Sequence, residues 1–256
     1  MGSKARVAKY IVPIIQKRID ESKFTTYFEP FCGGCNVIDK IICETKIAND
    51  IRKPLIELLV HAQLFKEFPD KITKEEYSSV RRNPENYDNW YVGCVGFLAS
   101  YNGRYFDGGY AKSGYEKTKS GERFRDYYRE AKDNLTNQAK QTEFQNIEFS
   151  CDDYANFITK ENPKGCVIYS DPPYRGTKQF SNSKDFDYEK FWQIMRELSK
   201  DNIVLISELN APKDFECIWS QEVSRSIKST DKGIATEKLF TYKKGKYIVD
   251  WSVCNE

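Results

Sequence analysis

The chain has 256 residues, of which 39% are hydrophobic, and its formal net charge at pH 7 is only +2. This length suits one domain, or one core with an inserted subdomain, and the small charge excludes a chain that binds nucleic acid by being basic throughout. No apolar run approaches the roughly 18 residues of a membrane span and no signal-peptide pattern is present, so we expect a cytoplasmic protein without membrane contact.

Eight cysteines and a single histidine restrict the metal and nucleophilic chemistry of the chain. The cysteines are scattered among apolar neighbours, so we interpret them as free thiols, many of them buried. Cys32 and Cys35 form a CxxC motif, but a zinc site needs two more ligands and His61 lies far from any second pair. We therefore expect no metal site and no Ser/His or Cys/His catalytic arrangement.

The first part of the chain alternates helical and strand patterns. Apolar residues at helical spacing predict a helix within residues 4–20, with Pro13 kinking or restarting it. The elements that we expect next are a strand at 25–28, a Gly-Gly loop at 31–36, a helix at 37–43, a strand at 46–50 that ends on an acid, and a helix at 51–65. This order predicts an α/β unit with a parallel sheet.

The alternation breaks between residues 66 and 145, where we expect helical pieces near 90–100 and 122–140. It then resumes with a strand at 147–151, a short helix, a strand at 166–169, a helix at 188–198, a strand at 203–207 and an antiparallel hairpin of 238–242 with 247–253. We therefore predict a core formed by residues 1–65 and 146–256, with an inserted subdomain at 66–145.

Three of the expected strands end in residues that suit a ligand. In an open parallel sheet, ligands bind at the carboxyl ends of the strands. The loop after the first strand contains Gly33, where a ligand can approach the backbone, and Asp50 follows the next strand, where an acid commonly binds ribose hydroxyls. A Gly-Gly turn alone is mostly just a turn, and an aspartate after a strand is often a helix N-cap. Their order along the chain is what indicates a nucleotide site, although no GxGxxG or P-loop motif is present.

The tetrapeptide Asp171-Pro172-Pro173-Tyr174 follows a third strand. Its prolines cannot donate to a sheet ladder, so the strand must end there. A planar base with an exocyclic amine could stack on Tyr174 while it donates hydrogen bonds to the Asp171 carboxylate and to the carbonyl of Pro172. The tetrapeptide therefore suits recognition of such a base.

In this order, the segment 29–34 (EPFCGG), Asn49-Asp50 and the tetrapeptide resemble the successive motifs of S-adenosylmethionine-dependent DNA adenine-N6 methyltransferases of the Dam-like (alpha) group. The segments 2–4 (GSK) and 101–106 (YNGRYF) resemble two further stretches of that family. The resemblance implies a Rossmann-like methyltransferase core: a mostly parallel seven-stranded sheet with helices on both faces and a C-terminal antiparallel hairpin. It also implies an inserted, mainly helical target-recognition subdomain.

The same resemblance implies roles for individual residues. The cofactor, S-adenosylmethionine, would be bound by Lys4, Phe31, Gly33, Asp50, Asp153, Tyr154 and Asp171. Asp171 and the carbonyl of Pro172 would accept hydrogen bonds from the N6 amine of a flipped adenine, and Tyr174 would stack on the base. For Tyr154, a place in the apolar core is an equally good interpretation.

Basic and aromatic side chains interleave between residues 104 and 132, as in segments that contact DNA. The candidate DNA-binding residues are Arg104, Lys112, Lys117, Lys119, Arg123 and Arg125. A solvated loop followed by a salt-bridged helix is the alternative interpretation of this stretch. The basic stretch at 225–246 is either a second phosphate-binding track or a solubilising edge.

Aspartate at the head of the tetrapeptide favours adenine, because cytosine-N4 enzymes usually have serine there and glutamine-N5 enzymes asparagine. A methyltransferase for RNA adenine or another planar amine or amide is one alternative, and a catalytically silent DNA-binding regulator on the same fold is the other. We expect double-stranded DNA as the partner of a monomeric enzyme from a bacterial host or a phage. A cognate restriction nuclease in the same system is a further partner that we consider.

Overall fold

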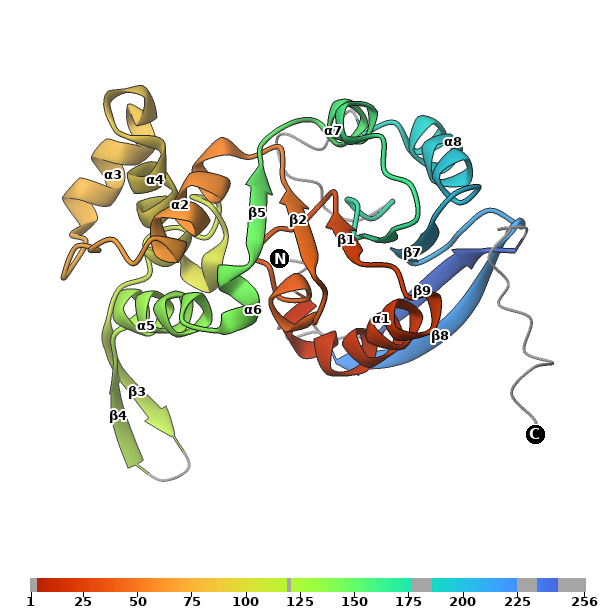
Figure 1. Cartoon of the computed structure of the whole chain (residues 1–256). Helices are drawn as coiled ribbons and strands as arrows, with labels where there is room; N and C mark the ends of the chain where they lie inside the picture. The colour runs from red at the N-terminus through yellow and green to blue at the C-terminus, as the bar shows by residue number, and fades with distance from the viewer. Residues whose placement is uncertain (1–3, 119–120, 176–185, 225–233, 244–256) are drawn as a thin grey trace.

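The computed structural model describes residues 4–118, 121–175, 186–224 and 234–243 (Figure 1). Its centre is a seven-stranded sheet with the strand order β5-β2-β1-β6-β7-β9-β8. The strands are β1 (Thr26–Glu29), β2 (Thr45–Asn49), β5 (Ile147–Ser150), β6 (Val167–Ser170), β7 (Ile203–Ser207), β8 (Phe215–Ser224) and β9 (Ile234–Tyr242). The five strands from β5 to β7 are parallel, and β9 pairs antiparallel with both β7 and β8. The predicted Rossmann-like sheet with an antiparallel pair near its C-terminal end is confirmed.

The order of the strands reverses between β1 and β6. From β1 the chain moves outward through β2 to β5, then returns to place β6 on the other side of β1 and moves outward again to β7. The register pairs Phe28 with Ile47 on one side and with Ile168 on the other. The carboxyl ends of β1 and β6 therefore flank the switch point, where open α/β sheets bind their ligands.

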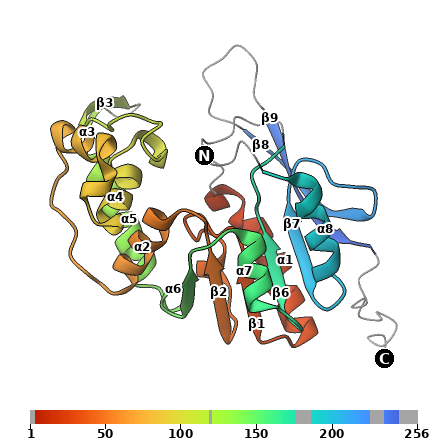
Figure 2. The ribbon, with the colours of Figure 1, turned by 90° about the horizontal axis from the view of Figure 1, so that it is seen from above.

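Helices cover both faces of the sheet, as Figures 1 and 2 show. They are α1 (Ala8–Ser22), preceded by a 3₁₀ turn η1 (Lys4–Arg6), on one face, with α7 (Tyr154–Glu161) and α8 (Tyr188–Leu198) on the other. Helix α2 (Lys53–Gln63) lies at the β5 edge of the sheet, beside α4 (Asn89–Gly93) and α5 (Tyr127–Ala139). Successive residues of a strand face opposite sides, so Tyr27 packs in the same core cluster as α1, whereas Phe28 packs with α7 and α8. Within the described ranges, no helix combines the length and the apolar character needed to cross a membrane.

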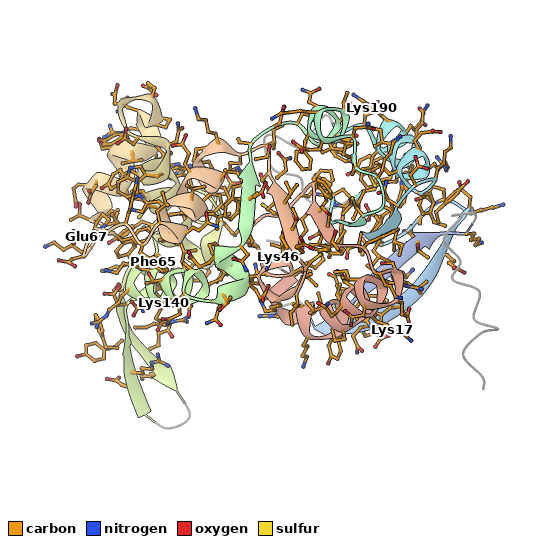
Figure 3. All side chains as sticks on the ribbon, viewed as in Figure 1. Lys17, Lys46, Phe65, Glu67, Lys140 and Lys190 are labelled. Atoms are coloured by element: carbon orange, nitrogen blue, oxygen red, sulfur yellow. The ribbon has the colours of Figure 1, made fainter. Side chains whose placement is uncertain are left out.

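Residues between β2 and β5 add a second group of elements beyond the β5 edge of the sheet (Figures 1 and 2). They are α3 (Lys74–Arg82), η3 (Pro84–Asn86), α4 (Asn89–Gly93), a π-helical turn η4 (Cys94–Leu98), η5 (Tyr101–Gly103), the hairpin β3 (Gly114–Thr118) with β4 (Gly121–Arg125), α5 (Tyr127–Ala139) and α6 (Thr142–Gln145). Helix α2 packs closely on α4, because Gly93 offers no side chain: a Cβ there would lie 2.0 Å from the carbonyl oxygen of Pro54. Figure 3 shows the side chains that fill both parts, with Lys46 inside and Lys17 and Lys190 on the outside.

The helix predicted at 37–43 is wrong. Only a 3₁₀ turn, η2 (Ile38–Lys40), forms there, and Ile41 is already extended. Four of the seven residues are β-branched (Val37, Ile38, Ile41 and Ile42), which lowers helix propensity because their side chains lose rotamer freedom in a helix. The segment instead forms a turn that buries Val37, Ile38 and Ile41 in the same core cluster as α1.

The helix predicted at 122–140 is right only from Tyr127 onward, because residues 121–125 form β4. Asp126 marks the boundary: its side chain accepts a hydrogen bond from the Arg129 amide at 3.1 Å and so caps the first turn of α5. At the C-terminal end, β9 pairs with the unpredicted strand β8. The segment 247–253, which was expected to pair with 238–242, lies outside the described residues, as does much of the basic stretch 225–246.

Candidate active site

The loop after β1 and the acid after β2 are tied together at the carboxyl edge of the sheet. One carboxylate oxygen of Asp50 accepts a hydrogen bond from the Gly33 amide at 3.2 Å, and the other accepts from the Arg52 amide at 2.9 Å. Gly33 has φ +49°, a left-handed conformation that glycine adopts without strain. Burial raises the pKa of Asp50, and the amide of Arg52 opposes this shift. The carboxylate is thus held in place by backbone groups and keeps lone pairs for a ligand.

An aromatic cluster lies beside this loop. The rings of Phe31 and Tyr154 are 5.0 Å apart, and Phe186 lies 5.4 Å from Tyr154. The Tyr154 hydroxyl is buried and finds no hydrogen-bond partner within the described residues, an arrangement that calls for a ligand or a water. Asp153 caps α7 by accepting from the Ala155 amide at 2.9 Å. Tyr154 therefore packs its ring in the apolar core while its buried hydroxyl lacks a hydrogen-bond partner among the described residues.

A charged cluster surrounds Asp171 at the end of β6. The Lys4 ammonium lies 2.8 Å from Oδ1 of Asp171 and donates to the Tyr174 hydroxyl at 2.6 Å. The Tyr174 hydroxyl in turn donates to Oε2 of Glu237 at 2.9 Å. Burial raises the pKa of Asp171, and the neighbouring Lys4 ammonium lowers it. Asp171 is thus a mostly buried carboxyl whose ionised form is supported by one cation.

Two acids at this site were missed by the sequence analysis. Glu237 lies on β9, and nothing in its spacing to the tetrapeptide indicates that they meet. Glu208 follows β7 directly and accepts from the amides of Arg175 and Leu209 at 3.3 and 2.7 Å. The end-of-strand pattern that singles out Asp50 and Asp171 would have found Glu208 as well.

The candidate DNA-binding residues lie in different surroundings. Lys117 and Arg123 are exposed on the β3–β4 hairpin, and Arg125 pairs with Glu130 at 2.8 Å. Lys112 lines a cleft of about 450 Å³. The Nε of Arg104 is buried and has no hydrogen-bond partner among the described residues.

The sixth candidate, Lys119, lies outside the described residues, as do Gly2 and Ser3. Two exposed aromatic rings also belong to the hairpin: Tyr115 and Phe124 lie on paired positions with their centroids 5.4 Å apart. The exposed fraction is 76% for Tyr115 and 54% for Phe124.

An open α/β sheet binds its ligand at the carboxyl edge near the switch point, and an acid, a glycine loop and the Asp-Pro-Pro-Tyr turn come together at that edge here. This arrangement defines a class of α/β protein with a nucleotide-type site. The chain belongs to the D12 class of N6 adenine-specific DNA methyltransferases, whose family model matches residues 1–208. No curated protein matches the chain. The protein therefore methylates the N6 amine of adenine in DNA, with S-adenosylmethionine as the methyl donor.

The residues at the switch point fit this cofactor. Asp50 offers a fixed carboxylate, Tyr154 an orphaned buried hydroxyl, and Gly33 has open space where a side chain would project. Within the described residues, no group of three or more His, Cys, Asp or Glu side chains is arranged to hold a metal ion. The carboxyl edge of the sheet thus holds several polar groups that can accept hydrogen bonds from a ligand or donate them to it.

Proposed function

We propose that Asp171 and the carbonyl of Pro172 accept the two hydrogen bonds of the N6 amine of an adenine flipped out of duplex DNA, and that Tyr174 stacks on that base. The N6 lone pair is delocalised into the ring, so the amine is a poor nucleophile until both N–H groups meet acceptors. The observation that carries this proposal is the mostly buried Asp171 carboxyl, at the end of β6, with the Lys4 ammonium 2.8 Å away.

The chemical contributions of these residues are positioning and electrostatics. A fixed carboxylate faces the positive charge that develops on N6 and stabilises it in a site with little water. When bound, S-adenosylmethionine supplies the methyl group. Asp171 need not act as a strong base, because the methylated amine is acidic enough to lose its proton afterwards. Unstacking the adenine costs a few kcal/mol, which stacking on Tyr174 offsets in part.

For the cofactor, we propose that Asp50 accepts from the ribose hydroxyls and that Asp153 and Tyr154 lie at its adenine ring. Phe31, Gly33 and Lys4 would line the methionine side, next to Asp171. The spare lone pairs of Asp50 and the orphaned Tyr154 hydroxyl support this assignment. We further propose that residues 1–65 and 146–256 form the catalytic core and that residues 66–145 recognise the target.

The finer identity of the enzyme belongs to the same proposal. It would act as a monomer on double-stranded DNA in the cytoplasm of a bacterium, encoded by the host or by a phage. A cognate restriction nuclease is a further partner that we propose, for the case of a restriction-modification system. Single-molecule sequencing of DNA from an expressing host would reveal the recognised motif and the modified base together.

The test of the residue roles is direct. Purified protein, tritiated S-adenosylmethionine and duplex DNA should yield N6-methyladenine, and Asp171→Ala should lower the rate by about 1,000-fold or more, because the amine loses its charged acceptor. Asp201→Asn, in an exposed turn, is the matched control and should keep the wild-type rate. Methylation by Asp171→Ala at the wild-type rate would refute these roles. The same assay with an RNA substrate tests the alternative that the enzyme acts on RNA adenine, because faster methylation of RNA than of duplex DNA would favour that alternative.

A further inference from the structure

The Lys4 ammonium is shared by two carboxylates at the candidate active site. Its Nζ lies 2.8 Å from Oδ1 of Asp171 and 3.4 Å from Oε2 of Glu237. The side chains of Lys4, Asp171 and Glu237 are 7%, 19% and 17% exposed. One cation between two mostly buried carboxylates leaves a net negative charge, so its position depends on which carboxylate is the stronger partner.

Glu237 also holds the tyrosine of the tetrapeptide. Its carboxylate accepts from the Tyr174 hydroxyl at 2.9 Å, and the Lys4 ammonium lies 4.6 Å from the Tyr174 ring centroid. Strand β9 runs antiparallel to β7, with Leu239 paired to Ser207 at the carboxyl end of β7. Residues just before Leu239 therefore project past that end, toward the edge where Asp171 lies. The sheet itself brings Glu237 to the site.

The Lys4 ammonium contacts only Oδ1 of Asp171, so Oδ2 can still accept from the substrate amine. The ammonium nevertheless neutralises much of the negative charge that makes Asp171 a strong acceptor. During methyl transfer, positive charge develops on N6, and a cation left at 2.8 Å from Asp171 would oppose it. Lys4 therefore needs a second anion within reach, and Glu237 is that anion.

Resting on the proposed function, we propose that Glu237 is a positioning residue for methyl transfer, which receives the Lys4 ammonium from Asp171 when the adenine amine enters and keeps the Tyr174 hydroxyl fixed meanwhile. The 3.4 Å separation between Lys4 and Glu237 then contracts to a charge-assisted hydrogen bond of about 2.8 Å. The matched family region ends at residue 208, so this role is assigned from the contacts of β9 alone.

Glu237→Gln keeps a hydrogen-bond acceptor for Tyr174 but removes the charge that attracts Lys4. The single-turnover rate should fall by about 100-fold, because the ammonium stays on Asp171 and opposes the positive charge that develops on N6. The affinity for S-adenosylmethionine, measured by calorimetry, should stay within about twofold of the wild-type value. Glu216→Gln, on the paired strand β8 and exposed, is the matched control and should keep the wild-type rate.

The pH profile distinguishes this role from a merely structural one. Lys4→Met should move the acid limb of the rate to higher pH, because Asp171 loses the cation that favours its ionised form. Adding Glu237→Gln to Lys4→Met should move the limb back, because a neighbouring negative charge is removed. The other titratable groups that face Asp171 are Glu29, Tyr169, Tyr174 and Glu208, and they are the same in all variants.

The outcomes separate this inference from the proposed function. A wild-type enzyme that leaves duplex DNA unmethylated refutes the proposed function. If the wild type is active, two results together refute only the role of Glu237. The first is that Glu237→Gln is as fast as Glu216→Gln, and the second is that the acid limb of the double variant equals that of Lys4→Met. Glu237→Asp is the second variant. It keeps the negative charge, so the acid limb should stay at the wild-type pH, but its shorter side chain reaches Lys4 less well, so the rate should fall.

Discussion

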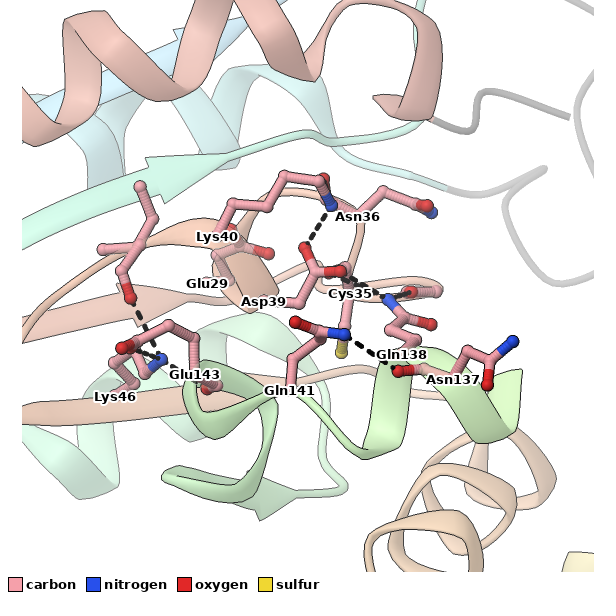
Figure 4. A network of polar contacts seen from close by, with 12 residues as sticks. Glu29, Cys35, Asn36, Asp39, Lys40, Lys46, Asn137, Gln138, Gln141 and Glu143 are labelled. Atoms are coloured by element: carbon pink, nitrogen blue, oxygen red, sulfur yellow. Dashed lines mark hydrogen bonds and ion pairs between the residues drawn. The ribbon is translucent and has the colours of Figure 1, made fainter. Parts of the chain in front are cut away.

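The side-chain amide of Gln138 donates a hydrogen bond to the carbonyl of Gly34 at 3.0 Å (Figure 4). The same nitrogen lies 3.3 Å from the carbonyl oxygen of Cys35 and 2.9 Å from Oδ2 of Asp39. Gln138 belongs to α5, which follows the β3–β4 hairpin directly, whereas Gly34 belongs to the loop after β1. One side chain thus joins the proposed target-recognition part to the loop that we assign to the cofactor.

Gln138→Ala should weaken cofactor binding, because the loop then loses its fixed partner on α5. Each hydrogen bond of this kind contributes about 1 kcal/mol, so a loss of about fivefold to tenfold in affinity for S-adenosylmethionine is expected by calorimetry. Gln141→Ala is the matched control: the side chain of Gln141, close by in Figure 4, donates to the Asn137 carbonyl in an exposed position and makes no hydrogen bond with the loop among the described residues. Equal affinities for the two variants would show that the contact does not order the loop.

Lys46 is a charged residue inside a parallel strand. Its side chain is fully buried, and its ammonium contacts the carboxylate of Glu143 at 2.6 Å and the carbonyl of Ile41 at 3.0 Å. Figure 3 places it in the interior of the molecule. Removing the Glu143 carboxylate leaves the buried Lys46 ammonium without a compensating charge. Removing the Lys46 ammonium instead leaves an acid that is 29% exposed and can turn toward water.

Glu143→Ala should therefore lower the free energy of unfolding by about 3 kcal/mol, and Lys46→Met by only about 1 kcal/mol. Urea unfolding of the two variants measures the asymmetry. Glu197→Ala, which breaks the exposed pair with Lys200, is the control and should cost less than about 0.5 kcal/mol. A larger loss of stability for Lys46→Met than for Glu143→Ala would contradict the idea that the unpaired buried ammonium causes the loss.

Much of the core was predictable because its signals are local. Asp50 and Asp171 directly follow short parallel strands, and in a parallel sheet every such acid falls on the same edge. The turn at 37–43 was mistaken for a helix because its apolar spacing is helical while its β-branched residues are not suited to one. The meeting of Lys4 with Glu237 has no local signal: it depends on the antiparallel placement of β9, and the partner strand β8 was not predicted at all.

Glu208 should give the fold a dependence on pH. Its side chain is buried, which raises its pKa from 4.5 to about 7, and the negative charge of Asp171 adds to this shift. Between these two pH values the unfolded chain ionises Glu208 freely while the folded protein retains the proton. The contribution of this group to stability is therefore undiminished below pH 4.5 and falls as the pH rises to about 7.

Glu208→Gln removes that titration. The free energy of unfolding of the variant, relative to wild type, should increase between pH 5 and pH 8, as measured by urea denaturation at several pH values. Glu222→Gln, exposed on β8, should show a difference from wild type that does not change with pH. A constant difference for Glu208→Gln as well would mean that burial does not hold this carboxyl in its neutral form.

The hairpin should contribute phosphate contacts if it lies on DNA. Lys117→Gln and Arg123→Gln should each reduce the slope of log K against log salt by about 1 and weaken binding similarly for all sequences. Arg123 pairs with Glu130 at 3.2 Å yet remains 70% exposed, so its guanidinium is accessible to a phosphate. Lys17→Gln on α1, 64% exposed, is the control and should leave the slope unchanged. Slopes equal to wild type in both hairpin variants would remove the hairpin from the DNA-binding surface.

Tyr115 and Phe124 make a different prediction, because their rings carry no charge. Two exposed aromatic rings in contact on paired strands suit stacking on bases, which contributes about 1–3 kcal/mol per ring. Tyr115→Ala and Phe124→Ala should each weaken DNA binding by at least about fivefold at constant salt, while the salt slope stays at the wild-type value. Tyr10→Ala, an exposed tyrosine on α1, is the matched control. Salt titrations of fluorescence anisotropy measure both quantities, and a changed slope with unchanged affinity would show that the rings act only through the neighbouring charges.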